Sequence, residues 1–193
     1  MAIILYGGPQ TRASMPRWYM EEMDIPYELV ELSLAEGQHL KEDFLSINPF
    51  GKLPAMKDDS VLDANEQPLI LFESGAILLH LAEHHGGEIK HPSDRSLISQ
   101  WTHFANSTLA FAIFIPDQKR KTLPRLLTQL DSEIANGYFV NNQWGAADCA
   151  ISSYLAYIKM FFPNEDLSAY PAVETLIQAT RERPAYQKIM GLH

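Results

Sequence analysis

The sequence predicts a mixed α/β domain followed by an all-helical domain. In the first 85 residues, short apolar runs bounded by glycine and proline alternate with helical patterns in the order β-α-β, α, β-β-α. Beyond residue 92, the apolar patterns repeat at spacings of three and four, as in helices. Gly86, Gly87 and Pro92 mark the break between the two patterns. We therefore predict a first domain at 1–85, a linker at 86–92 and a second domain at 93–193.

The elements of the first domain follow from its apolar runs and turn residues. Residues 2–6 form a short apolar strand that Gly7 and Gly8 end, and a helix follows at 15–23 with Ser14 as its N-cap. The remaining elements are a strand at 27–32, a short helix at 39–47, a strand pair at 53–57 and 68–72, and a helix at 74–84.

The second domain is predicted from helical spacing alone. Its first helix begins after Ser93, an expected N-cap, and its apolar residues recur at three and four as far as Ile115. Prolines at the first position mark the starts of the last two helices. Beyond the first, the helices are predicted at 122–136, 146–161, 171–182 and 184–190.

The composition limits the possible partners. The 193 residues carry a net charge of −9, which disfavours nonspecific binding to nucleic-acid phosphates and to anionic lipid. We interpret the basic run at residues 119–121 as a solvated turn. The longest apolar run, residues 109–115, is too short to span a bilayer, and the N-terminus lacks the basic region of a signal peptide. We therefore expect a cytoplasmic protein with no nucleic-acid and no membrane partner.

Cysteine and histidine usage argues against a metal centre. Cys149 is the only cysteine, which excludes an intrachain disulfide and a cysteine-rich zinc site, and we expect it to be a small core residue. His80 and His84 lie four residues apart on one helix, with His85 next to them, but the pattern offers no convincing third ligand. We interpret these three as surface histidines and predict no metal site.

The turn after the first strand, Thr11–Ser14, opens onto a helix. A redox protein of this topology places Cys-x-x-Cys at such a turn, because a helix N-terminus stabilises a thiolate. Hydroxyls occupy those two positions here, so this turn cannot exchange disulfides through thiols of its own. With Arg12 between them, the hydroxyls could stabilise a thiolate that a ligand supplies. The alternative is that Ser14 only caps the helix and that Arg12 is a surface residue.

Two further segments suggest a ligand with amino-acid ends. Asn48–Pro54 brackets a strand start with two prolines and a glycine, and an extended residue before a proline can pair with a peptide ligand; a plain turn is the alternative. Glu73 and Ser74 lie between an apolar strand and an apolar helix. Ser74 and the helix N-terminus suit a carboxylate, and Glu73 suits an ammonium group, although Ser74 could also act only as a cap.

These two segments, Asn-Pro-Phe-Gly-Lys-Leu-Pro at 48–54 and Glu-Ser-Gly-Ala-Ile-Leu-Leu-His-Leu-Ala-Glu at 73–83, together resemble the glutathione-binding half of cytosolic glutathione transferases. The resemblance spans almost the whole chain. The first turn and residues 18–22 look closest to the chi class of cyanobacteria. The resemblance implies a thioredoxin-like N-terminal domain, a C-terminal helical bundle and a homodimer.

The resemblance also implies which residues hold glutathione, the expected co-substrate. They are His39, Lys52, Leu53, Pro54, Glu73 and Ser74. His39 and Lys52 would face the glycine carboxylate of glutathione. Pro54 would follow a cis peptide bond, and the backbone of Leu53 would pair with the cysteine. Glu73 and Ser74 would hold the γ-glutamyl end.

Catalysis is expected in the first turn. The residues implied there are Arg12, Ser14 and Thr11, which would stabilise the thiolate. A small hydrophobic electrophile, such as an isothiocyanate or an aryl halide, would lie against the first helix of the second domain. The residues expected to line that part of the cleft are Trp101, Phe104, Asn106, Ser107 and Phe111.

The chain departs from the family pattern in ways that leave other functions open. No tyrosine or cysteine lies at the usual place in the first loop, and Tyr6 is expected in the core. Gly145 replaces the usual hydroxyl cap three residues before Asp148, which predicts a slightly weaker helix start. A non-catalytic binding module and a carrier of hydrophobic ligands are the alternatives to an enzyme.

Overall fold

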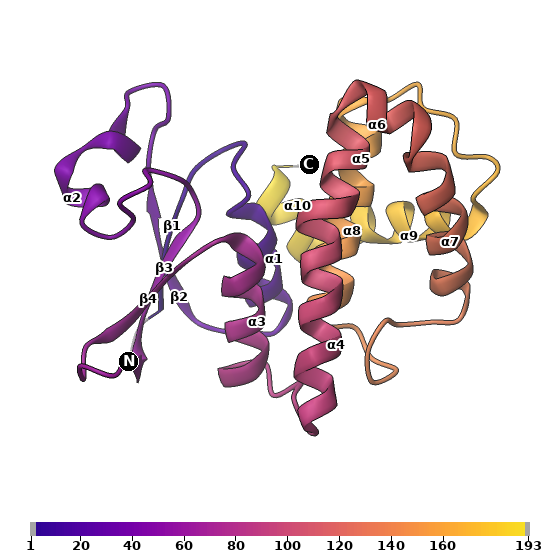
Figure 1. The fold of residues 1–193 in the computed structure, drawn as a ribbon. Helices are drawn as coiled ribbons and strands as arrows, with labels where there is room; N and C mark the ends of the chain where they lie inside the picture. Colours follow the sequence, from indigo (N-terminus) through magenta and orange to yellow (C-terminus); the bar gives the residue numbers. More distant parts are fainter. Residues whose placement is uncertain (1–2, 192–193) are drawn as a thin grey trace. The chain divides into compact units, whose positions relative to one another are not determined.

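The computed structural model describes residues 3–191 and divides into two compact units, one ending at Gly86 and the other beginning at Gly87 (Figure 1). Each unit is described by itself. The predicted first strand includes Ala2, which lies outside the described residues.

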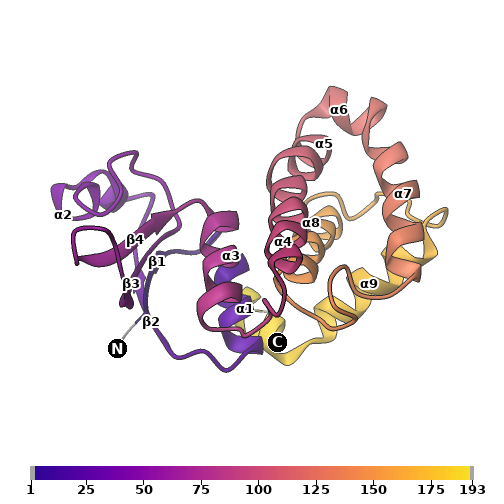
Figure 2. The same ribbon diagram turned by 60° about the horizontal axis from the view of Figure 1, so that its bottom comes forward.

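The first unit is built on a four-stranded mixed sheet in the order β2-β1-β3-β4. The central strand β1 (Ile3–Gly7) pairs in parallel with β2 (Tyr27–Glu31) and antiparallel with β3 (Ala55–Leu62). Strand β4 (Pro68–Phe72) closes the far edge against β3. Helices α1 (Ser14–Glu22) and α3 (Ser74–His84) lie together on one side of the sheet, and α2 (Glu42–Leu45) lies on the other (Figures 1 and 2).

The core of this unit lies between the sheet and the helix pair. Leu5 and Met56 of the sheet, Trp18 of α1, and Ile77 and Leu81 of α3 are all fully or almost fully buried. Alternation along β1 predicts this arrangement, because every second side chain of a strand points to the same face.

Local signals placed most elements of the first unit, with three corrections. The strand expected at 53–57 is β3 (Ala55–Leu62), so it begins later and includes Asp58, which was expected in the link to the next strand. The helix expected at 39–47 is a 3₁₀ turn, η1 (Gln38–Leu40), followed by α2. The first helix starts at Ser14, so Ala13 occupies the N-cap position and the prediction of Ser14 as the cap is wrong. Instead, the Ser14 hydroxyl donates to the Thr11 carbonyl at 3.2 Å.

The second unit consists of helices around α8 (Ala146–Phe161), most of whose residues are buried. The central helix contacts α4 (Pro92–His103), α5 (Ala110–Phe114) and α9 (Pro171–Glu182). The others are α6 (Pro116–Lys121), α7 (Leu123–Ala135) and α10 (Pro184–Met190). Cys149 is fully buried on α8, which confirms its prediction as a core residue. Within residues 3–191, no helix is long and apolar enough to cross a membrane.

The helix expected at 93–115 is interrupted, which corrects the prediction. Residues 104–109 form a π-helical segment, η2 (Phe104–Leu109), between α4 and α5. Two polar contacts accompany the change of winding. The Ser107 hydroxyl donates to the His103 carbonyl at 2.7 Å, and the Tyr154 hydroxyl donates to Asn106 Oδ1 at 2.7 Å. Side-chain bonds of this kind compete with the regular helical ladder.

The basic run at residues 119–121 is helical rather than a turn, but Arg120 and Lys121 are solvated as expected. Lys119 forms an ion pair with Glu165 at 2.6 Å, and its ammonium group lies 3.6 Å from the centre of the Phe162 ring. Arg120 and Lys121 both pair with Asp117 in the first turn of the same short helix α6. All three basic side chains therefore form ion pairs with acidic residues of the second unit.

The start of α8 is capped by a distant carboxylate, which corrects the expectation of a weaker cap. Glu88, just after the division between the units, accepts the Ala146 N–H with both oxygens at 3.0 and 3.1 Å and is only 3% exposed. A Cβ at position 145 would collide with that carboxylate, so a larger residue there would have to displace Glu88. Asp148 adds two bonds, from the N–H groups of Gly145 and Phe139.

Candidate functional site

A pocket of about 590 Å³ opens in the first unit, where loops from the sheet meet the starts of α1 and α3. All three segments singled out from the sequence contribute to it. The residues that line it are Gln10, Thr11, Arg12, Leu34, His39, Asn48, Phe50, Gly51, Lys52, Leu53, Pro54, Phe72, Glu73 and Ser74. The six residues expected to hold glutathione are therefore brought together, as are two of the three expected to act on the thiol.

The loop after β1 brings Thr11 and Arg12 to the pocket, but the Thr11 hydroxyl has a structural role. It donates to the Gly8 carbonyl at 2.8 Å and accepts the N–H groups of Gly8 and Ala13, each at 3.3 Å. These bonds shape the turn that leads into α1. Arg12 is exposed at the pocket, whereas Ser14 does not line it.

The loop before β3 is held by a buried amide. Asn48, fully buried, donates through Nδ2 to the Lys52 carbonyl at 2.8 Å and accepts the Phe50 N–H at 3.2 Å. These bonds present Lys52 and Leu53 to the pocket. The Leu53–Pro54 peptide bond is cis, as the resemblance implied.

The start of α3 forms the opposite side of the pocket. Glu73 occupies the N-cap position with φ of 72° and ψ of 117°, a backbone conformation that is strained for a non-glycine residue. Ser74 is the first residue of the helix and is 1% exposed, so it does not occupy the N-cap position that its alternative role required. The strained backbone of Glu73 carries its carboxyl group at the mouth of the pocket, next to the positive end of the helix.

The pocket is lined by both basic and acidic side chains. Arg12, His39 and Lys52 supply its basic groups, whereas Glu73 supplies a carboxylate beside the N-terminus of α3. A ligand that carries two carboxylates and one ammonium group would find a partner for each. Two aromatic rings, Phe50 and Phe72, pack edge to face with centroids 5.3 Å apart at the rim.

The residues expected to face an electrophile all lie in the second unit. Trp101 packs against Phe104 and Phe139, with ring centroids 5.7 and 4.5 Å away. Asn106 and Ser107 make the polar contacts of η2 described above. Phe111 is 64% exposed, which leaves it the most available of the five for an apolar ligand.

Sequence reasoning missed some of the pocket. Gln10 and Leu34 line it without belonging to a recognised motif, and Phe72, which begins the third motif, lines it without a predicted role. Gln10 and Glu73 both have positive φ, and neither is the glycine that would have signalled it.

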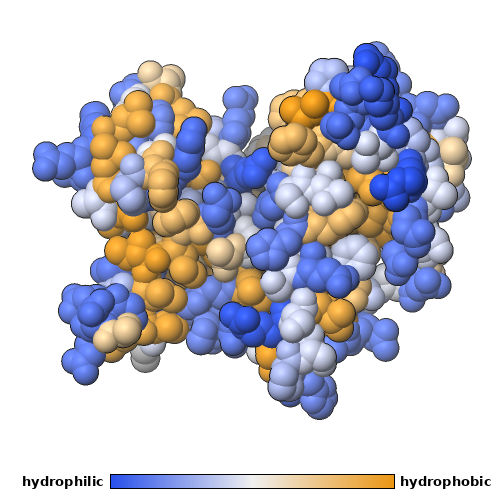
Figure 3. Space-filling view, in the orientation of Figure 1, coloured by the Kyte–Doolittle hydropathy of each residue, from blue (hydrophilic) through white to orange (hydrophobic). Residues whose placement is uncertain are grey.

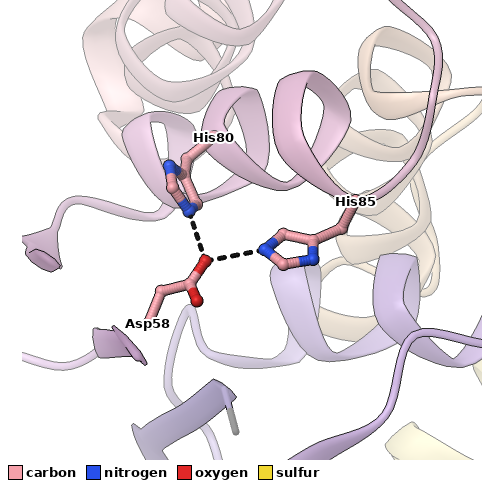
Figure 4. Close-up of side chains that lie close together, drawn as sticks. All are labelled: Asp58, His80 and His85. Carbon is pink, nitrogen blue, oxygen red and sulfur yellow. Dashed lines mark hydrogen bonds and ion pairs between the residues drawn. The ribbon is translucent and has the colours of Figure 1, made fainter. Parts of the chain in front are cut away.

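The interpretation of the histidines is also wrong in part. His84 is exposed as expected, but His80 is only 6% exposed and His85 is partly buried (Figure 4). Both Nε2 atoms contact Asp58 Oδ2, at 2.8 Å from His80 and 2.6 Å from His85. Asp58 lies in β3, more than twenty residues from either histidine, so no local pattern could indicate it.

Two family models and several curated proteins match this chain. The N-terminal domain of glutathione S-transferases matches residues 1–83, and the C-terminal domain matches residues 108–188. The disulfide-bond oxidoreductase YfcG of Escherichia coli K12 is 31% identical over 95% of this chain and 92% of its own length. The glutathione S-transferase GstB of the same organism is 29% identical, over 89% of this chain and 88% of its own.

Two solved structures are similar over nearly the whole chain at 25% identity. A glutathione transferase from Burkholderia graminis, with two glutathione molecules bound per subunit, has a TM-score of 0.83 and is matched over 99% of this chain and 88% of its own. One from Pseudomonas putida, with one glutathione disulfide bound per subunit, has a TM-score of 0.79 over 99% and 91%.

Proposed function

Because this chain belongs to the glutathione S-transferase family, we propose that it binds glutathione in the pocket of the first unit and ionises the thiol for attack on small hydrophobic electrophiles. The observation that carries the proposal is the convergence of the first turn, the Asn48–Pro54 loop and the start of α3 on one pocket. The glutathione-bound structures of two relatives support it.

Glutathione would lie across the pocket according to charge. Its γ-glutamyl carboxylate would approach Ser74 and the N-terminus of α3, and its ammonium group would approach Glu73. The backbone of Leu53 would pair with the cysteine residue. The glycine carboxylate would meet His39 and Lys52 on the other side of the pocket.

The thiolate would depend first on Arg12. A free thiol has a pKa of about 8.5, and lowering it by two units takes about 2.7 kcal/mol of differential stabilisation. A guanidinium at the pocket edge can supply part of that through charge. The Thr11 hydroxyl would have to turn away from the Gly8 carbonyl to donate to sulfur, and Ser14 lies outside the pocket lining, so both rank below Arg12.

The proposal is tested by calorimetric titration with glutathione and by turnover with 1-chloro-2,4-dinitrobenzene and benzyl isothiocyanate. We expect one binding event that Glu73→Gln weakens and Glu28→Gln does not, because Glu28 is exposed on β2 and does not line the pocket. Turnover with either electrophile supports a transferase. Binding without turnover would favour the carrier or the binding module.

A second candidate is glutathione-dependent disulfide reduction, which the name of the 31% identical relative favours. Cys149 is buried, so the two electrons would come from two glutathione thiols: the first opens the substrate disulfide, and the second releases the substrate thiol and forms glutathione disulfide. Reduction of hydroxyethyl disulfide, coupled to glutathione reductase, measures it. A rate that exceeds conjugation by more than tenfold would make this the main activity.

Two finer assignments belong to the same proposal. The first turn and residues 18–22 support a position near the chi class. A homodimer is supported by the family and by the apolar surface of the first unit that Figure 3 shows. Leu40 and Phe50 of that unit are 61% and 67% exposed. Light scattering that gives a 21.8 kDa particle at micromolar concentration would contradict the dimer.

A further inference from the structure

Three potential metal ligands meet beneath α3, away from the residues that line the pocket. Asp58 comes from β3, His80 from α3, and His85 from the residue after the last turn of that helix (Figure 4). One ligand atom from each, two imidazole nitrogens and a carboxylate oxygen, lies within 4.8 Å of the other two. Asp58 is fully buried and His80 almost so, whereas the His85 side chain is 20% exposed.

The carboxylate of Asp58 is oriented by its own strand. Its Oδ1 atom accepts the Ser60 N–H at 2.8 Å and the Ser60 hydroxyl at 2.6 Å. That arrangement leaves Oδ2 facing both imidazoles. Hydrogen bonds to the non-ligating oxygen of a carboxylate are typical of the groups that orient metal ligands.

The donor set of the cluster suits a cation. Two imidazole nitrogens and one carboxylate oxygen are ligands typical of zinc and neighbouring transition metals. They come from β3 and from the C-terminal end of α3 and converge on one point.

We propose that Asp58, His80 and His85 bind a divalent transition metal ion, with Zn²⁺ the best match, and that the ion fastens the C-terminal end of α3 to β3. The present contacts of 2.6 and 2.8 Å are hydrogen bonds. Zn–N and Zn–O bonds of about 2.0–2.2 Å place tetrahedral ligands about 3.3 Å apart. Metal binding therefore requires the rings to move outward by roughly half an ångström and to lose the Nε2 protons. A water at the exposed edge of His85 would complete the tetrahedron.

The metal site would stabilise the first unit, which also contains the pocket, although none of its three ligands lines the pocket. Strand β3 follows Pro54, and α3 begins with Ser74, so the ion would join the two elements that follow these pocket residues. The proposal does not depend on glutathione binding, and its tests are made without glutathione.

The full chain, stripped with a chelator and returned to metal-free buffer, is titrated with Zn²⁺ against a chromophoric chelator. We expect one equivalent to bind, and Asp58→Asn and His85→Ala to weaken its affinity by at least tenfold each. His103→Ala is the matched control, because it removes an exposed histidine from α4, and it should bind like the wild type. Circular dichroism verifies that each variant is folded. The proposal is overturned if the wild type binds no saturable equivalent of Zn²⁺, or if both site variants still bind one as tightly as the wild type.

Co²⁺ in place of Zn²⁺ tests the ligand set directly. The wild type should develop the intense visible bands of a tetrahedral ion, and both site variants should lose them. His84→Ala separates the cluster from a surface pair, since the ring of exposed His84 lies 4.6 Å from that of His80. It should keep the bands. Bands that His84→Ala removes and His85→Ala keeps would contradict the assignment.

Discussion

Two helix N-termini in this protein are used in opposite ways. The start of α8 meets Glu88 and Asp148, two buried carboxylates of the chain itself. The start of α3 has Glu73 in a strained backbone conformation and opens onto the pocket. Unpaired N–H groups at a helix N-terminus need acceptors in both cases. At the α8 start the chain supplies buried acceptors and closes the helix end, whereas the α3 start lies open at a pocket that a ligand could fill.

The comparison predicts a pH dependence that belongs to α8. Burial raises the pKa of Asp148 to about 7, the bonds from Phe139 and Gly145 oppose the rise, and nearby Glu88 adds to it. A raised folded-state pKa means that the folded protein keeps a proton that the unfolded chain releases. The associated stability is complete below about pH 4 and is lost as pH rises through 7.

Wild type should therefore lose stability relative to Asp148→Asn between pH 4 and 7, by at most about 1.4 kcal/mol per pH unit. Urea unfolding of both proteins at several pH values measures the difference. If the unfolding free energies of the two proteins change with pH in parallel, Asp148 is ionised over the whole range. Its burial would then raise its pKa less than expected.

Removing the distant cap should destabilise the fold without touching the pocket. Glu88→Ala leaves the Ala146 N–H buried without its carboxylate, and loss of a charged hydrogen bond costs about 1.5–3 kcal/mol. Urea unfolding should show this loss, while glutathione affinity should stay within twofold of wild type.

A second substitution sharpens this test. Gly145→Ser introduces the hydroxyl cap that the family resemblance led us to expect, yet alone it should also destabilise, because its Cβ meets Glu88. In the Glu88→Ala background the same change should be tolerated or favourable. Simple additivity of the two effects would show that Glu88 and position 145 do not compete for the same space.

The α3 start should behave in the opposite way. Glu73→Gly relieves a strained backbone and should raise unfolding stability by about 1 kcal/mol, while weakening glutathione binding roughly tenfold or more. Glu73→Ala should lose binding to the same extent without the gain in stability. A Gly variant that binds glutathione normally would remove Glu73 from the site.

Ser74→Ala probes the neighbouring position. It should raise KM for glutathione far more than it lowers kcat, because the interaction is with the γ-glutamyl end rather than with the reacting sulfur. Thermal unfolding is measured in parallel, since Ser74 is also buried at the helix start. An unchanged KM would contradict this placement of glutathione.

Sequence predicted what local signals determine. The bounds of α3, α8, α9 and α10 were predicted to the residue, because a glycine, a proline or a polar-to-apolar change marks each start. The two motif segments that line the pocket also carry local signals, whereas their convergence on one pocket depends on the fold.

What sequence missed depends on pairs far apart in the chain. Glu88 meets Ala146 across 58 residues, and Asp58 meets His80 across 22, so neither cap nor cluster leaves a local pattern. The π-helical segment η2 was missed for a similar reason, since Asn106 accepts a bond from Tyr154. The positive φ of Glu73 is set by its surroundings rather than by its residue type.

The proposed role of Arg12, to lower the pKa of a bound thiol, can be measured on the complex itself. The direct test is the thiolate absorbance of the protein–glutathione complex as pH is varied, for wild type, Arg12→Ala and the control Arg125→Ala, which removes an exposed guanidinium of α7. Thr11→Ala and Ser14→Ala assign any hydroxyl contribution. We predict a wild-type pKa well below 8.5, a rise of about one unit or more in Arg12→Ala, equivalent to about 1.4 kcal/mol, and no change in Arg125→Ala. An Arg12→Ala complex that titrates like the wild type would contradict the account.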